Sequence, residues 1–214
     1  MSLIKICGLS RLEDIEAANA CLPDFIGFVF AESRRRVTAG QAAVLKERLS
    51  PRIKAVGVFV NAPLEEVRAL REGGVIDMAQ LHGDEDEEYM RRLKDVCHIP
   101  IIKALRLGAS GQSGPPSPQA GGTDGELARG ADYLLFDAFT EGERGGSGNS
   151  FDWSLTPPTA KPFFLAGGLG AGNLAEAIRR LRPYGVDLSS GAEIDGRKDF
   201  GLMSRLVEIA RREA

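Results

Sequence analysis

The chain has 214 residues, 43% of them hydrophobic and 27% charged, and its formal net charge is −3. This composition is typical of a globular protein, and the slight negative charge excludes the basic footprint of a nucleic-acid-binding protein. No apolar run approaches the roughly 20 residues of a membrane span. We therefore expect no nucleic-acid partner and no membrane association, and the N-terminus lacks the apolar core of a signal peptide.

Three cysteines, Cys7, Cys21 and Cys97, are present without any C-x-x-C pattern, and the only histidines are His82 and His98. An odd number of scattered cysteines argues against a disulfide framework and against a zinc site. We expect no bound metal and a reducing, cytoplasmic location.

Eight short runs, rich in β-branched and aromatic residues, are near-continuously apolar, which is typical of a parallel sheet covered on both faces. They are Leu3–Cys7, Phe25–Phe30, Ala55–Val60, Met78–Leu81, Ile101–Ala104, Tyr133–Asp137, Phe163–Ala166 and Val186–Ser189. Helical patterns fill most of the intervals between them. They are Leu12–Ala20, Ala39–Leu49, Leu64–Arg71, Glu85–Val96, Asp124–Arg129, Ala171–Leu181 and Phe200–Arg211.

Eight strand–helix units of about 27 residues each predict a compact (β/α)8 TIM barrel, forming one domain over residues 1–214. The competing architecture, an open doubly wound sheet, would require a Gly-x-Gly-x-x-Gly turn after the first strand, and Cys7–Gly8–Leu9–Ser10 differs from it. After Asp137 only Phe151–Leu155 suggests a helical turn. The Gly/Ser/Pro-rich segment 108–122 reads as a mobile loop that follows the fifth strand.

Polar residues stand before several predicted helices and are candidate N-caps. Ser10, Asp84 and Asp199 each precede a helical pattern, and their side chains could accept hydrogen bonds from the first free N–H groups of the helix.

Cys7 is the last residue of the first strand and directly precedes Gly8. A lone cysteine in an apolar strand is usually an inert core residue, but the active sites of TIM barrels lie at the carboxyl ends of the strands. Lys5, two residues earlier, points to the same side of the strand, and an ammonium group near a thiol favours the thiolate. A lysine held at the surface or in a salt bridge is the alternative.

Three further side chains are candidates at strand ends. Asp137 ends the sixth strand, where it could cap the next turn or act as a proton donor opposite Cys7. His82 follows the fourth strand and could be catalytic, bind substrate or brace loops. In Ser33–Arg34–Arg35–Arg36, after the second strand, one arginine could reach inward to bind a carboxylate, while the other two are expected to be solvated.

Glycine-rich turns follow the last three strands. They contain Gly145 and Gly146 after the sixth strand, Gly167 and Gly168 after the seventh, and Ser190 and Gly191 after the eighth, where Ala192 and Glu193 could begin a short extra helix. TIM barrels often bind phosphate with these loops through backbone N–H groups. Glycine also simply makes turns, but three such turns in these loops favour a phosphate site.

Taken together, these motifs resemble the phosphoribosylanthranilate isomerase family of tryptophan biosynthesis. The matching pieces run in order along nearly the whole chain: Lys5–Leu9, Gly27–Phe30, Ser33–Arg35, Val56–Asn61, Gln80–Asp84, Phe136–Asp137, Gly145–Gly148, Phe151–Trp153, Leu165–Leu169, Asn173, Val186–Asp187 and Ser189–Gly191.

The resemblance implies an Amadori rearrangement of N-(5-phosphoribosyl)anthranilate to 1-(2-carboxyphenylamino)-1-deoxyribulose 5-phosphate without a cofactor. It implies Cys7 as general base, Asp137 as general acid and Arg35 as the residue that binds the anthranilate carboxylate. The glycine turns would hold the phosphate of this small phosphosugar. The oligomeric state is left open between monomer and homodimer.

Two rival functions remain. A histidine-pathway isomerase catalyses the same rearrangement on another aminoaldose phosphate, but barrels of that kind resemble this one with an aspartate in place of Cys7. A catalytically silent phosphosugar-binding barrel is a second alternative, and the presence of both Cys7 and Asp137 argues against it.

Overall fold

The computed structural model describes residues 2–106, 129–137 and 156–213. Its strands are β1 (Leu3–Cys7), β2 (Phe25–Val29), β3 (Lys54–Phe59), β4 (Met78–Leu81), β5 (Ile101–Arg106), β6 (Tyr133–Asp137), β7 (Phe163–Ala166), β8 (Gly185–Leu188), β9 (Glu193–Ile194) and β10 (Arg197–Lys198). The described helices are α1 (Leu12–Cys21), α2 (Ala39–Arg48), α3 (Leu64–Glu72), α4 (Glu87–Cys97), α5 (Leu174–Leu181), α6 (Phe200–Arg212) and the short 3-10 helix η3 (Ser190–Ala192).

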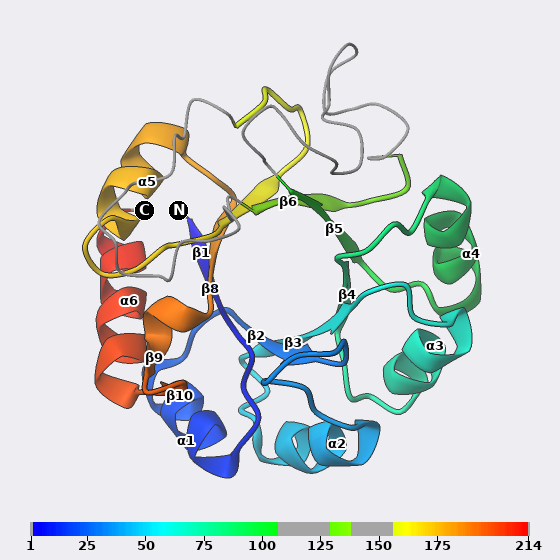
Figure 1. The fold of residues 1–214 in the computed structure, drawn as a ribbon, viewed down its shortest axis with the longest axis horizontal. Coiled ribbons are helices and arrows are strands. Elements are labelled where there is room, and N and C mark those ends of the chain that lie inside the picture. The colour runs from blue at the N-terminus through cyan, green and yellow to red at the C-terminus, as the bar shows by residue number, and fades with distance from the viewer. Residues whose placement is uncertain (1, 107–128, 138–155, 214) are drawn as a thin grey trace.

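Strands β1 to β8 form a closed barrel in sequence order, and all their pairings are parallel. The barrel closes at β1, where Lys5 is opposite Phe25 of β2 on one side and Asp187 of β8 on the other. The described helices surround the ring of strands (Figure 1). The predicted (β/α)8 fold is therefore confirmed.

All eight predicted strands are present, with small differences in their ends. Helices α1 to α6 match six of the predicted helical patterns, although α4 and α5 begin two or three residues later than expected. The predicted helix at Asp124–Arg129 falls almost entirely outside the described residues. The predicted turn at Phe151–Leu155 and the loop at 108–122 fall entirely outside them.

One of the three predicted N-caps is confirmed. Asp199 accepts a hydrogen bond from the N–H of Leu202 at the start of α6. At α1 the capping oxygen comes instead from Asp14, which lies inside the helix and accepts from the N–H of Ser10. Helix α4 begins after Asp86, whose carboxylate accepts from the N–H of Tyr89, so the prediction for Asp84 was two residues too early.

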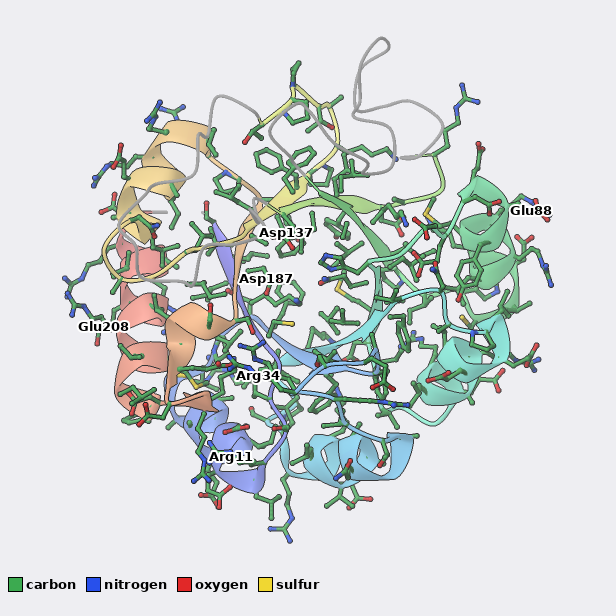
Figure 2. The ribbon with its side chains drawn as sticks, in the orientation of Figure 1. Arg11, Arg34, Glu88, Asp137, Asp187 and Glu208 are labelled. Atoms are coloured by element: carbon green, nitrogen blue, oxygen red, sulfur yellow. The ribbon has the colours of Figure 1, made fainter. Side chains whose placement is uncertain are left out.

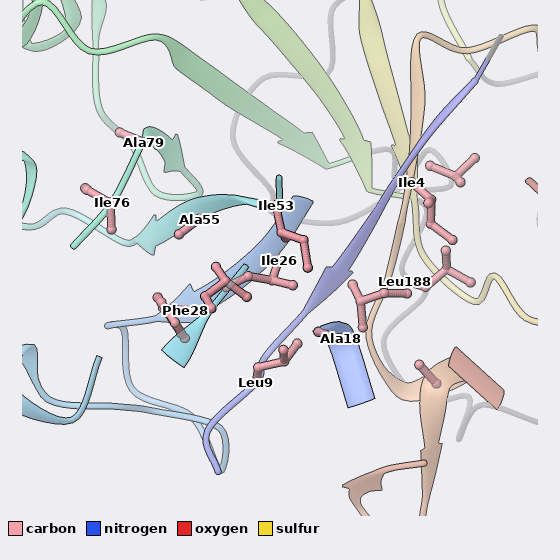
Figure 3. Close-up of a cluster of buried hydrophobic side chains, with 14 of the residues drawn as sticks. Ile4, Leu9, Ala18, Ile26, Phe28, Ile53, Ala55, Ile76, Ala79 and Leu188 are labelled. Carbon is pink, nitrogen blue, oxygen red and sulfur yellow. The ribbon is translucent and has the colours of Figure 1, made fainter. Parts of the chain in front are cut away.

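The larger hydrophobic core lies between the strands and the surrounding helices. Alternate strand residues point outward into it, among them Ile4 and Ile26, and they pack against helix residues such as Ala18 (Figure 3). Because this core covers the outer face of the barrel, the inner face is free to carry a separate set of side chains.

The inner face is apolar near the amino-terminal ends of the strands. The rings of Phe25 and Phe164 meet edge to face with centroids 5.7 Å apart, and Tyr133 and Tyr184 pack against Phe164 at 6.0 and 5.5 Å. This aromatic cluster fills the barrel at that end. Polar inward positions are consequently concentrated toward the carboxyl ends of the strands. None of the described helices combines the length and the apolar character needed to cross a membrane.

Candidate active site

Cys7 and Asp137 lie on the inner face of the barrel, at the same end. Leu3 and Leu135 both pack into the interior cluster that only strand residues form. Side chains alternate along a strand, so Lys5 and Cys7 share the face of Leu3, and Asp137 shares that of Leu135. Both are the last residues of parallel strands, and Figure 2 shows Asp137 inside the ring. The structure thus brings the predicted acid and base to one barrel mouth.

Lys5 is fully buried beneath Cys7. Its Nζ lies 2.8 Å from Oδ2 of Asp187 on the neighbouring strand β8 and also donates a hydrogen bond to the Cys7 thiol. Burial alone would favour the neutral amine, but the negative groups of Asp187 and Cys7 together outweigh it and raise the pKa of Lys5. The side chain is therefore an ammonium ion. Of the two alternatives for Lys5, the surface position is wrong and the salt bridge is confirmed, with Asp187 as the partner.

The thiol of Cys7 is buried and surrounded by cations. Burial raises the pKa of Cys7 above its ordinary value, and the positive charges of Lys5 and Lys198 oppose this only in part. The expectation that Lys5 favours the thiolate is correct in sign. However, the loss of hydration on burial outweighs it, so the pKa of the Cys7 thiol remains above its ordinary value.

Gly27 makes room for the Cys7 side chain. It is opposite Cys7 in the register of β1 and β2. A Cβ atom at Gly27 would lie 2.6 Å from Cys7 Sγ and 3.1 Å from its Cα. The absence of a side chain here fixes where the sulfur can sit.

His82 lies beside Asp137. Its Nε2 is 3.4 Å from Oδ2 of Asp137, and its Nδ1 is 3.1 Å from Nε2 of Gln80. If the Gln80 amide donates to Nδ1, the neutral imidazole carries its proton on Nε2, which faces Asp137. His82 is therefore placed to orient the Asp137 carboxyl group.

A buried ion pair fixes the loop that carries His82. Lys103 Nζ lies 2.9 Å from Glu85 Oε2 and donates to the carbonyl of Gly83. Glu85 also accepts from the N–H groups of Asn61 and Gly83. This pairing draws Glu85 out of the helix that was predicted to include it, which explains the later start of α4.

Of the three neighbouring arginines, Arg35 is the one held toward the barrel mouth. Its side chain is 21% exposed, against 62% for Arg34 and 52% for Arg36. Its stem lies so close to Gly8 that a Cβ there would overlap it. Its guanidinium group forms two hydrogen bonds to Glu193, from Nε at 2.6 Å and from Nη2 at 2.8 Å.

The glycine turns after β7 and β8 are packed together. A Cβ at Gly191 would collide with the carbonyl oxygen of Leu169. Gly167 and Gly168 have φ angles of +89° and +62°, which other residues rarely adopt. A Cβ at Gly168 would meet no atom within 4 Å among the described residues. Ser190 begins the 3-10 helix η3, whose first N–H groups have no partner within the helix.

Gly145 and Gly146, the candidates after β6, lie outside the described residues. The extra helix expected after β8 differs from the prediction. It is a single turn, Ser190–Ala192, that starts two residues earlier, and Glu193 then enters a two-stranded hairpin with Lys198 instead of continuing the helix.

Several residues of this site were missed from the sequence. Asp187 is the first of them: a buried lone ammonium is costly, so Lys5 needs an acidic partner, and the acid within the apolar run Val186–Leu188 was the available signal. Glu193 carried no local signal, since its partner Arg35 lies 158 positions earlier. The role of Gly27 depends on the barrel register, which the sequence does not display.

Comparisons with known proteins agree with this geometry. The N-(5'-phosphoribosyl)anthranilate isomerase of Endomicrobium trichonymphae is 43% identical over 211 residues, which cover 99% of both chains. The crystal structure of phosphoribosyl anthranilate isomerase from Thermotoga maritima superposes with a TM-score of 0.82 and 33% identity, covering 99% of this chain and 100% of that one.

A further solved relative holds a ligand. It is a phosphoribosyl anthranilate isomerase in complex with reduced 1-(o-carboxyphenylamino)-1-deoxyribulose 5-phosphate, with a TM-score of 0.77, 28% identity and coverage of 99% of this chain and 100% of that one. Residues 4–209 match the family described as N-(5'phosphoribosyl)anthranilate (PRA) isomerase. With this match over nearly the whole length, and with the barrel and its mouth as described, the chain belongs to the N-(5'-phosphoribosyl)anthranilate isomerase family.

Proposed function

We propose that Cys7 and Asp137 are the base and the acid with which this chain isomerises N-(5'-phosphoribosyl)anthranilate in tryptophan biosynthesis. The observation that carries this assignment is their common position, at the last inward-facing residues of β1 and β6. The reaction is an Amadori rearrangement, which converts an aminoaldose into an aminoketose and therefore requires one proton donor and one proton acceptor.

Asp137 acts first. Its carboxyl group protonates the ring oxygen of the ribose as the bond between that oxygen and C1 breaks, and the nitrogen lone pair forms the C1–N double bond of an iminium ion. His82, 3.4 Å from Asp137, orients the carboxyl group and faces the carboxylate that remains. The iminium ion then serves as the electron sink for the second step, so the chemistry needs no cofactor.

Cys7 acts second. Its thiolate removes the proton from C2, the C–H electron pair forms the C1–C2 double bond, and the iminium nitrogen takes up the displaced pair. The resulting enolamine tautomerises to the ketone. Lys5 and Lys198 supply the positive charge that makes the thiolate accessible in a buried position, and they offset part of its desolvation cost.

The two anionic ends of the substrate, its carboxylate and its phosphate, are bound by different parts of the site. Arg35 is the arginine held at the mouth and binds the anthranilate carboxylate through its guanidinium group. The packed glycine turns with Gly168, Ser190 and Gly191 bind the phosphate through backbone N–H groups. The unpaired thiols Cys7, Cys21 and Cys97 favour a reducing compartment, and we place the reaction in the cytoplasm.

The test is the loss of substrate fluorescence when the protein is mixed with freshly generated phosphoribosylanthranilate. Cys7→Ser should lower kcat by several orders of magnitude, because an alcohol is a far weaker base than a thiol. Asp137→Asn should lower kcat by about 10²-fold or more, the usual size of an acid–base contribution. Cys97→Ser, at a half-buried thiol on α4, is the matched control and should be active.

Substrate deuterated at C2 separates the two roles. Cys7→Ser makes proton removal limiting and should show a full primary isotope effect, whereas Asp137→Asn makes ring opening limiting and should suppress it. Equal isotope effects in the two variants, or near-wild-type turnover in Cys7→Ser, would contradict the assignment.

A further inference from the structure

The carboxylate of Glu193 is surrounded by three cations at the barrel mouth. Its Oε1 lies 2.6 Å from Arg35 Nε and 2.7 Å from Lys198 Nζ, and its Oε2 lies 2.8 Å from Arg35 Nη2 and 3.0 Å from Arg34 Nη2. The Glu193 side chain is only 4% exposed, and that of Lys198 only 1%. Glu193 is thus a fixed, fully ionised group, and not a mobile surface acid.

The charges around Glu193 fix its ionisation. Burial disfavours the carboxylate, but the hydrogen bonds from Arg35 and Lys198 overcome this and lower the pKa of Glu193 to about 2. Lys198 in turn is anchored by the carbonyl of Ser189, at 2.9 Å from its Nζ. The cluster is therefore tied to the end of β8, beside the turn proposed for the phosphate.

Glu193 occupies one particular edge of the Arg35 guanidinium group. A guanidinium has five N–H donors in a planar fork. The edge formed by Nε and Nη2 is used by Glu193. In the part of the chain that the structure describes, this leaves the end-on edge, formed by Nη1 and the second N–H of Nη2. The stem of Arg35 is held against Gly8, directly after Cys7. Both the stem and the side edge are consequently fixed.

The cluster also retains an excess of positive charge. Among the described residues, Arg34, Arg35 and Lys198 all pair with the same carboxylate, that of Glu193, so the group as a whole still attracts an anion. A ligand carboxylate bound to the end-on edge of Arg35 would lie in the plane of the guanidinium group, with Glu193 on the neighbouring edge.

We infer that Glu193 is a positioning residue for substrate specificity. It holds Arg35 by its side edge so that the end-on edge receives the aromatic carboxylate of the substrate. This inference rests on the proposed function, in which Arg35 binds that carboxylate. It adds that the carboxylate of Glu193 is required for Arg35 to distinguish a ligand with the aromatic carboxylate from one without it.

If only charge mattered, removing the charge of Glu193 would strengthen the binding of the substrate carboxylate, whereas our inference predicts that it weakens it. Replacing Glu193 by glutamine removes a negative charge next to the proposed carboxylate site, and charge alone would then tighten the binding of an anion. A glutamate that merely competes with the substrate for Arg35 would have the same effect. Only the loss of a positioning contact weakens binding.

The experiment uses two ligands in calorimetric titrations of the full chain. One is reduced 1-(o-carboxyphenylamino)-1-deoxyribulose 5-phosphate, and the other is the same compound without the carboxyl group. Wild type should prefer the carboxylated ligand. Glu193→Gln should lose roughly tenfold to a hundredfold of that preference, the usual size of charged hydrogen bonds, while its affinity for the carboxyl-free ligand is unchanged.

Glu32→Gln is the matched control, because Glu32 pairs with the neighbouring Arg36 at the exposed surface, and its preference should equal that of wild type. If Glu193→Gln does not fold, Glu193→Asp keeps the charge but shortens the reach, and it should lose part of the preference. An unchanged or increased preference in a folded Glu193 variant overturns the inference. A wild type that does not distinguish the two ligands overturns the assignment of Arg35 itself.

Discussion

Gly27 provides the most direct test of how the structure places the sulfur of Cys7, the proposed base. Gly27→Ala adds one methyl group whose carbon would lie 2.6 Å from Cys7 Sγ, whereas ordinary contacts begin at 3.4 Å. The sulfur must therefore move by about 0.8 Å, since the Cα of Cys7 is itself only 3.1 Å away and cannot absorb the strain. Misplacing a reacting group by about 1 Å can cost 10²-fold in rate, and we expect a loss in kcat of this order.

A control variant at a second glycine, Gly57, separates a loss of stability from a loss of kcat. Gly57→Ala on β3 would place its Cβ 2.7 Å from the ring of Phe59, in the outer core and away from the mouth. Both variants overpack the protein and should lose about 1–3 kcal/mol, which thermal unfolding measures. Only Gly27→Ala should lose kcat in the fluorescence assay. A folded Gly27→Ala with wild-type kcat, or an equal loss of kcat in Gly57→Ala, would refute the reasoning.

Three other predictions follow from the site. The kcat/KM of wild type should rise with pH beyond the ordinary range of a thiol, because burial raises the pKa of Cys7 and its thiolate is the proposed base. Lys5→Met should move this rise to higher pH, and an unmoved profile would exclude Lys5 from lowering the pKa of the thiol. The KM of Gly168→Asp should be at least tenfold higher than that of Gly168→Asn, because the aspartate repels the phosphate and the asparagine has the same shape without the charge. Equal KM values in the two variants would place the phosphate elsewhere. Arg35→Ala should raise KM strongly and Arg36→Ala only slightly, and the reverse order would show that the wrong arginine was chosen.

The fold was predictable because a parallel barrel leaves a strong pattern in the sequence. Its strands are covered on both faces, so runs such as Phe25–Val29 and Phe163–Ala166 have no charged residue. Helix starts were less predictable. Asp84 precedes an acidic turn as a cap would, but Glu85 pairs with the buried Lys103, and this tertiary contact moves the start of α4 to Asp86.

The candidate site was predictable only where the chain order determines position. Cys7 and Asp137 end apolar strands, and all strands of a parallel barrel end at the same mouth. Contacts between neighbouring strands depend on their register, which no single strand encodes. The contact of Gly27 with Cys7 could therefore be found only from the register, which also pairs Lys5 with Asp187.

The distribution of charge at the mouth supports the proposed division of roles between Cys7 and Asp137. A thiolate is stabilised by ammonium and guanidinium groups, whereas a carboxyl group that must deliver a proton is disfavoured beside them. The structure places Lys5 and Lys198 beside Cys7, on the side of the barrel formed by β1 and β8. Asp137 lies on β6, next to the imidazole of His82. An exchange of roles would put the base where the cations are fewer, which supports our proposal that the Cys7 thiol is the base and the Asp137 carboxyl group is the acid.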